Sequence, residues 1–227
     1  MDQHTTRACR IELPPGGSVE GDLTVPEMAV GLVVFAHGSG SSRHSSRNRG
    51  VARALNQRGL ATLLMDLLTS DEEERDQFTR EHRFDIPLLS QRVAHTIDWV
   101  SRQDEPVASL PLGCFGASTG AAAALVAAAM RPDQVGAVVS RGGRPDLADE
   151  ALELVRAPTL LLVGGADPQV LELNEQAASR LTCPTRLEVI PGATHLFEEP
   201  GTLEQVEQHA ADWFLEHLGA APPADRT

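Results

Sequence analysis

Short apolar runs alternate with helical patterns along almost the whole chain, and this alternation constrains the fold more than any other feature. Residues 33–36 are apolar throughout, as expected of a strand that is covered on both faces. Apolar residues at helical spacing follow in segments such as 86–100, for which Asp85 is the predicted N-cap. The alternation predicts an α/β fold, in which helices flank a mostly parallel central sheet.

About eight strands and several helices are predicted, and the order in which they occur predicts one domain over residues 1–219. Residues 220–227 are expected to form a frayed tail. In such a sheet, ligands bind at the carboxyl ends of the strands, so the loops at those ends are the ones to search. The predicted strands are 7–13, 21–25, 31–36, 61–65, 110–115, 135–140, 159–163 and 186–190, and the predicted helices are 47–58, 86–100, 119–130, 147–155, 171–181 and 203–218.

Composition excludes several classes of partner. The formal net charge is -13, so nucleic acid and anionic membranes are repelled on average. The longest central apolar run, 121–130, is about half of the roughly 20 residues that a membrane-spanning helix needs. Residues 1–7 contain no apolar stretch, so no signal peptide is expected. These features predict a cytoplasmic protein that acts on a small molecule.

The three cysteines, Cys9, Cys114 and Cys183, are sparse and lack the spacing of metal ligands. Cys114 lies in an apolar run, which is typical of a buried and unreactive thiol. We therefore expect no metal site at these cysteines.

A Gly-x-Ser-x-Gly motif occupies residues 116–120, between an apolar strand and an apolar helix. On such a turn the serine has strained backbone geometry, and its hydroxyl projects above the sheet. Small residues are needed two positions before and after it, and both are glycine. The motif predicts Ser118 as a nucleophile, against the alternative of an incidental serine in a glycine-rich turn.

Partners for this serine follow it in the order acid and then histidine, as in α/β-hydrolases. Asp167 lies in the loop after strand 159–163, and His195 lies in the loop after strand 186–190. Taken alone, Asp167 could be a turn residue before proline and His195 an ordinary loop histidine. Their joint position predicts His195 as general base and Asp167 as the residue that orients it.

An oxyanion hole is predicted from the His-Gly-x loop that follows strand 31–36. One backbone N–H would come from Ser39 and the other from Thr119, the residue after the nucleophile. His37 is expected to brace this loop rather than to act as the catalytic base.

In these residues the chain resembles the dienelactone hydrolase family of the α/β-hydrolases, and the resemblance extends over nearly its whole length. The resemblance rests on the 116–120 turn, Asp167 and the Gly-Ala-Thr-His run at 192–195, and segments 35–42 and 140–145 look like a branch of small members. It implies a minimal hydrolase with little or no cap domain and no cofactor. Dienelactone hydrolases proper use a cysteine nucleophile, whereas this chain has Ser118, which favours ester or related acyl hydrolysis.

Three further side chains are possible substrate-binding residues. Arg141 follows strand 135–140 at the catalytic edge, where its guanidinium could clamp a substrate carboxylate. The alternative, which we favour, is an internal ion pair with a nearby acid (Asp146, Glu198 or Glu199). Arg43 and His44, after the oxyanion loop, have the same two interpretations.

The longest connection, 67–85, contains a run of charged residues and borders the predicted site. Most such runs are solvated surface. We expect a small flap here, with Phe78 and Phe84 as possible parts of an acyl pocket.

The sequence therefore predicts a serine hydrolase that cleaves ester, thioester or lactone bonds through an acyl-enzyme on Ser118. Acyl transfer by the same residues is an alternative, because another nucleophile can replace water. A non-catalytic ligand-binding protein on a hydrolase scaffold is disfavoured, since all three catalytic candidates are present.

Overall fold

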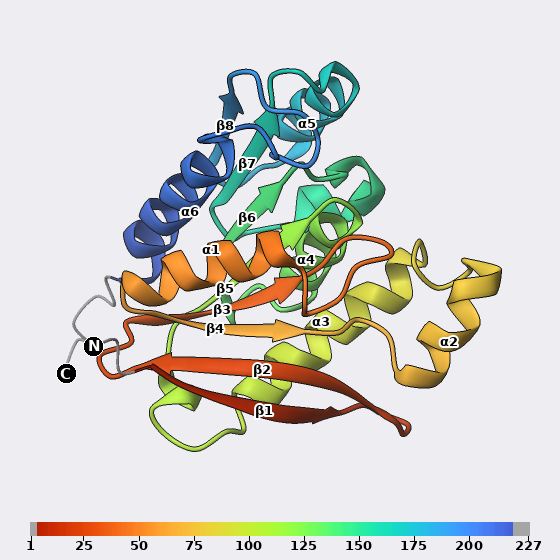
Figure 1. The fold of residues 1–227 in the computed structure, drawn as a ribbon, viewed down its shortest axis with the longest axis vertical. Helices are drawn as coiled ribbons and strands as arrows, with labels where there is room; N and C mark the ends of the chain where they lie inside the picture. Colours follow the sequence, from red (N-terminus) through yellow and green to blue (C-terminus); the bar gives the residue numbers. More distant parts are fainter. Residues whose placement is uncertain (1–3, 220–227) are drawn as a thin grey trace.

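The computed structural model describes residues 4–219, and the predicted tail at 220–227 lies outside them. One sheet runs through the molecule in the order β1-β2-β4-β3-β5-β6-β7-β8 (Figure 1). β1 and β2 form an antiparallel hairpin, β2 pairs antiparallel with β4, and the other pairs are parallel. The predicted mostly parallel sheet of eight strands is thus confirmed. The strands are β1 His4–Glu12, β2 Ser18–Pro26, β3 Gly31–Ala36, β4 Leu60–Met65, β5 Leu112–Ala117, β6 Val135–Arg141, β7 Thr159–Gly164 and β8 Thr185–Ile190.

The helices agree with the sequence patterns at most positions, with one addition and two changes. The addition is α2, within the charged connection, where apolar periodicity is weak but a capping box joins Thr69 and Glu72. The predicted helix 171–181 begins earlier, at Pro168, and the predicted helix 147–155 is a 3-10 segment. The helices are α1 Ser46–Gln57, α2 Ser70–Thr79, α3 Ile86–Val100, α4 Thr119–Met130, α5 Pro168–Arg180 and α6 Thr202–Leu218, and the 3-10 segments are η1 Val107–Ser109 and η2 Pro145–Leu154.

The sheet separates two apolar cores. α3 and α4 pack on one face, and α1 and α6 pack on the other, in front of the sheet in Figure 1. Every residue of β3, β4, β5 and β7 is buried, which explains why these strands are continuous apolar runs rather than alternating ones. Among the described residues, no helix combines the length and apolarity needed to cross a bilayer.

The connections leave the sheet in opposite directions at β3 and β5. These strands are neighbours, but the chain passes from β3 to α1 on one face and from β5 to α4 on the other. In open α/β sheets, this switch of direction opens a crevice at the carboxyl ends of the strands. The loop after β3 and the turn after β5 therefore border one crevice.

Candidate active site

Ser118 lies in the turn between β5 and α4, in a backbone conformation that few L-residues adopt. Its φ is 52° and its ψ is -123°, and such a conformation costs of order 1–3 kcal/mol. Hydrogen bonds hold the turn in place: the Ser118 N–H donates to the Arg141 carbonyl at 3.2 Å, and the Ser118 carbonyl accepts from the Arg144 N–H at 3.1 Å. The strained turn predicted from the motif is confirmed.

Both glycines of the motif are required by close backbone contacts. A Cβ on Gly116 would lie 2.4 Å from Ala121 Cα, and a Cβ on Gly120 would lie 2.3 Å from the Ala36 carbonyl oxygen. Gly116 therefore lets α4 approach β5, whereas Gly120 lets α4 approach the end of β3. The two glycines fix the position of Ser118 relative to both strands.

Asp167 and His195 meet across the loops that follow β7 and β8. His195 Nδ1 lies 3.0 Å from Asp167 Oδ2, and the two loops are joined by a 2.9 Å hydrogen bond from the Ala166 N–H to the Ala193 carbonyl. Because Nδ1 faces a carboxylate, it carries the hydrogen in the neutral ring and leaves Nε2 as an acceptor. Asp167 is also the N-cap of α5.

Gly142 brings the histidine loop beside the serine turn. It follows Arg141, whose carbonyl holds the Ser118 N–H, and a Cβ here would lie 3.1 Å from the His195 carbonyl oxygen. Its φ of 49° suits glycine. The hydrogen bonds found within residues 4–219 include none between Ser118 Oγ and His195, and such catalytic bonds are often long without substrate.

The predicted oxyanion loop lies against the serine. A Cβ on Gly38 would lie 3.1 Å from Ser118 Cβ, so a side chain at this position would crowd the serine. The Ser39 N–H donates to Thr119 Oγ1 at 2.9 Å. The two residues predicted to supply oxyanion donors are therefore in contact, and the Ser39 N–H already has an acceptor.

His37 braces this loop, as the sequence predicted. Its Nδ1 lies 2.9 Å from the Gly38 carbonyl, and its Nε2 accepts a 3.2 Å hydrogen bond from the Leu67 N–H. Burial lowers the pKa of His37 and keeps the ring neutral. His37 therefore ties the loop after β3 to the end of β4.

A pocket of about 260 Å³ opens between the oxyanion loop and α2. Its walls combine the loop after β3, the end of β4 and one side of α2, and Thr119 borders it. The connection expected to be a flap thus forms a wall of this pocket. The lining residues are His37, Gly38, Ser39, Gly40, Ser41, Ser42, Asp66, Leu67, Leu68, Glu73, Asp76, Gln77, Arg83, Leu89 and Thr119.

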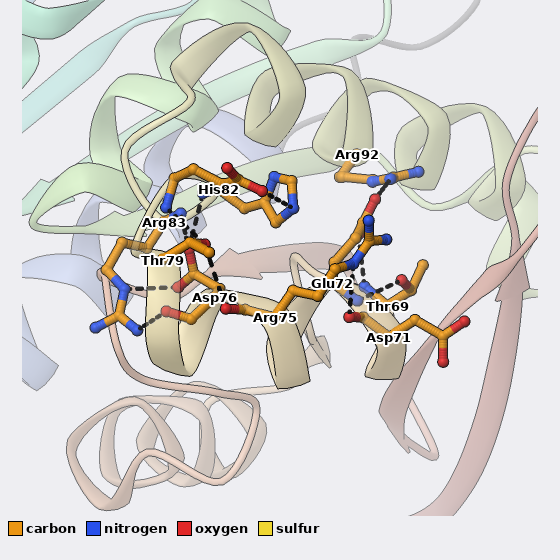
Figure 2. A network of polar contacts seen from close by, with 10 residues as sticks. Thr69, Asp71, Glu72, Arg75, Asp76, Thr79, His82, Arg83 and Arg92 are labelled. Carbon is orange, nitrogen blue, oxygen red and sulfur yellow. Dashed lines mark hydrogen bonds and ion pairs between the residues drawn. The ribbon is translucent and has the colours of Figure 1, made fainter.

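Polar contacts rather than apolar packing hold α2 in place (Figure 2). Asp76 is only 3% exposed, and its carboxylate accepts hydrogen bonds from Arg83 Nε at 2.6 Å and from the backbone N–H groups of His82 and Arg83. Arg92 of α3 donates to Glu72 at 2.6 Å. Burial tends to raise the pKa of Asp76, but the Arg83 and backbone hydrogen bonds outweigh it and hold that pKa below its ordinary value.

The expectation that Phe78 and Phe84 contribute to an acyl pocket is wrong. Their side chains are 85% and 56% exposed, and neither residue lines the pocket. The reason is that α2 turns its polar face inward, where Asp76 meets Arg83, and this leaves Phe78 on the outer face.

Arg43 and His44 have internal partners. The Arg43 guanidinium pairs with Asp66, and its backbone N–H donates to the same carboxylate at 2.8 Å. His44 Nδ1 lies 2.6 Å from Arg49 Nη2. Of the two interpretations, substrate binding and internal contacts, the structure favours internal contacts for both residues.

For Arg141 the favoured interpretation, an internal ion pair, is wrong. Each acid proposed for it has another partner: Arg144 holds Asp146 at 2.8 Å, Arg47 holds Glu198 at 3.1 Å, and Glu199 accepts from Thr194 at 2.6 Å. Arg141 shares the face of β6 that looks toward α1 and α6, where its guanidinium packs over the Phe197 ring. The sequence predicted acids near Arg141 but could not show toward which partners their carboxylates point.

Comparison with known proteins finds relatives of high identity over most of the chain. A crystal structure of dienelactone hydrolase from Anabaena variabilis is 54% identical, with a TM-score of 0.93 over 95% of this chain and 99% of that chain. A family model described as "Serine aminopeptidase, S33" matches residues 27–143. Est1E from Butyrivibrio proteoclasticus, 18% identical with a TM-score of 0.78 over 94% of this chain and 99% of that chain, shares the fold.

A longer relative bears a different description. A protein of Mycobacterium tuberculosis named as a candidate phosphoribosyl transferase is 59% identical over 206 residues, which cover 91% of this chain and 45% of the relative. The chain thus spans about half the length of the curated relatives it matches.

Proposed function

Since this chain belongs to the dienelactone hydrolase-like family of α/β-hydrolases, we propose that it cleaves carboxylic ester or thioester bonds of a small molecule through an acyl-enzyme on Ser118. The observation that carries the proposal is the strained backbone of Ser118, with a φ of 52° at the start of α4. Such strain persists where surrounding contacts impose it, and it clusters at active sites.

The proposed reaction begins with attack of Ser118 Oγ on the acyl carbonyl carbon. His195 Nε2 takes the hydroxyl proton, while Asp167 keeps the hydrogen on Nδ1 and stabilises the imidazolium that forms. Collapse of the tetrahedral intermediate breaks the ester bond, and His195 returns the proton to the leaving alcohol or thiol. Water then attacks the acyl-enzyme by the same route and releases the acid.

The negative charge of the intermediate would be met by the Thr119 N–H and the Ser39 N–H. Thr119 begins α4, so the positive end of that helix adds to the same field. The Ser39 N–H donates to Thr119 Oγ1, so the oxyanion would share or replace that acceptor. We propose that the Thr119 hydroxyl keeps the Ser39 N–H oriented toward the oxyanion position until the oxyanion forms.

The longer relatives are described as transferases, but this chain spans only 45% of their length, so we do not propose transferase activity of that kind for it. Peptidase activity, which the description of the family model suggests, uses the same nucleophile and is therefore an arm of the test.

The test is pre-steady-state hydrolysis of p-nitrophenyl esters of graded acyl length, beside a lactone, a thioester and an aminoacyl p-nitroanilide. The wild-type protein should give a burst of about one p-nitrophenol per chain, followed by slower turnover. Ser118→Ala should lose the burst and at least about 10³-fold of kcat with the fold intact. An alcohol added as acceptor distinguishes acyl transfer from hydrolysis.

Ser179→Ala provides a matched control, because Ser179 lies on α5 and its hydroxyl donates to the Gln176 carbonyl within the same helix. This variant should retain the burst. Full esterase activity in Ser118→Ala would overturn the proposal.

A further inference from the structure

Arg141 is a buried cation for which the described residues offer no acidic partner. The residue is 7% exposed, and its Nε and Nη1 groups are buried without a hydrogen-bond acceptor in residues 4–219. Nη2 donates a long 3.4 Å bond to Asn48, and the guanidinium lies 5.9 Å from the centre of the Phe197 ring. Burial, with a smaller contribution from the Arg47 charge, lowers the pKa of Arg141 to about 10, so it remains charged at neutral pH.

A buried charge without a counterion is costly, and proteins retain such charges mainly at functional sites. Asp146 and Glu198, two of the acids expected to pair with Arg141, are engaged elsewhere, and its charged neighbour is another arginine, Arg47. The local charge is therefore positive, although the whole chain is strongly acidic. A bound anion would neutralise this charge.

Arg141 points toward the N-terminal turn of α1, a helix of 12 residues. Its Nη2 contacts Asn48, which lies in that turn and whose own N–H is capped by Ser45 Oγ. The N–H groups of Ser46 and Arg47 precede the first intrahelical bond, and none of the hydrogen bonds in the described part of the chain uses them. This turn also contains no acidic residue, although acids are favoured at that position.

We propose that Arg141, Arg47 and the first turn of α1 bind a phosphate monoester group of the substrate, beside Ser118; this inference rests on the proposed function. Two guanidiniums match the double charge of a phosphate, and its three terminal oxygens can accept from the guanidinium and backbone donors together. The Arg141 carbonyl accepts the Ser118 N–H, so the backbone that carries Arg141 is held directly beside the nucleophile. The pocket beside α2 is on the other side of the turn and remains free for the rest of the substrate.

Glu198 would compete with a bound phosphate for Arg47. Arg47 Nη1 lies 3.1 Å from Glu198 Oε1, and Arg47 Nε is buried without an acceptor in residues 4–219. Both side chains are partly exposed, and ion pairs of this kind exchange partners readily. In the proposed complex a phosphate oxygen takes the place of the Glu198 carboxylate on Arg47.

The experiment compares three esters of the same leaving group: p-nitrophenyl 3-phosphonopropionate, p-nitrophenyl hemisuccinate and p-nitrophenyl butyrate. For the wild-type protein, kcat/KM for the phosphonate ester should exceed that for the butyrate ester by about 10-fold or more at low salt. Arg141→Gln should lower the phosphonate value about 10-fold or more while changing the butyrate value less than about threefold. Arg58→Gln is the matched control, since it removes the same charge from an exposed ion pair with Asp212 at the other end of α1.

Binding of inorganic phosphate, measured by calorimetry, tests the site without turnover. Phosphate should bind the wild-type protein, bind Arg47→Gln several-fold more weakly, and bind Glu198→Gln more tightly, because the competing carboxylate is gone. Arg47 and Glu198 are partly exposed, so these variants remain informative if Arg141→Gln does not fold.

The outcomes separate this inference from the proposed function. Phosphate binding that is several-fold weaker in Arg47→Gln supports the site even if no ester is cleaved. Cleavage of all three esters at equal kcat/KM, a higher value for the hemisuccinate than for the phosphonate, or an equal loss on all three in Arg141→Gln overturns it while the esterase proposal stands.

Discussion

The two sides of the Ser118 turn use arginine in different ways. On the α2 side, Arg83 meets the buried carboxylate of Asp76, and Arg92 meets Glu72, so that each charge is neutralised within the protein. On the α1 side, Arg141 is as deeply buried as Arg92, but it has no acid beside it within residues 4–219. The difference indicates that charges on the α2 side hold a polar segment in place, whereas the charge of Arg141 on the α1 side is available to a ligand.

The largest effect should come from Asp167→Asn. Asparagine is as good an N-cap as aspartate, so α5 should persist and stability should change little. The amide cannot hold His195 in the required tautomer, and we expect kcat to fall by about 10³–10⁴-fold in ester hydrolysis. An unfolded variant would assign Asp167 to the scaffold and would remove the contrast between the two sides.

Asp76→Asn should have the opposite profile, with a loss of stability rather than of kcat. The change removes the charge that Arg83 and two backbone N–H groups contact, and we expect a loss of about 2 kcal/mol in urea unfolding. This is less than the full cost of breaking a buried pair, because Arg83 is partly exposed.

The stabilisation by Asp76 should also depend on pH. Because the folded-state pKa lies below the ordinary value of 3.8, the contribution is complete above about pH 4 and is lost as the pH falls through the folded-state pKa. The difference in unfolding free energy between wild type and Asp76→Asn should therefore shrink on acidification. A difference that stays constant from pH 7 to pH 3 would contradict this assignment.

Unlike Asp76→Asn, Arg141→Met should raise the unfolding free energy slightly or leave it unchanged. Methionine fills much of the same volume and removes an unpaired buried charge, so we expect a gain of zero to about 1 kcal/mol in unfolding free energy. A loss of about 3 kcal/mol or more would mean that Arg141 belongs to the scaffold after all. Hydrolysis of neutral esters should change little in the same variant.

The smallest effect should come from Phe78→Ser on the outer face of α2. Because Phe78 is exposed and does not line the pocket, the unfolding free energy should change by no more than about 0.5 kcal/mol, and kcat should be unchanged. A marked fall in activity would show that the outer face of α2 takes part in substrate binding.

The fold and the order of the candidate catalytic residues could be predicted because both depend on local patterns. β3 and β5 are apolar runs bounded by glycine-rich loops, and the parallel sheet brings their carboxyl ends together. The contact between Asp167 and His195 follows from the same rule, since β7 and β8 are neighbours.

The other features depend on which way helices and side chains point, and local sequence patterns do not reveal this. α2 has little apolar periodicity, so the only local signal was the capping box at Thr69 and Glu72. Gly142 could have been suspected from the paired glycines after a strand, but its contact with His195 comes from a loop more than 50 residues away. An internal ion pair was wrongly predicted for Arg141, because Asp146 pairs with Arg144 instead.

The central claim, that Ser118 is the nucleophile, is tested most directly by labelling with a fluorophosphonate probe followed by mass spectrometry of the peptides. The account predicts one adduct per chain on Ser118, no adduct in Ser118→Ala, and much slower labelling in His195→Ala. An adduct on another residue in the wild-type protein, or undiminished labelling of Ser118→Ala, would contradict it.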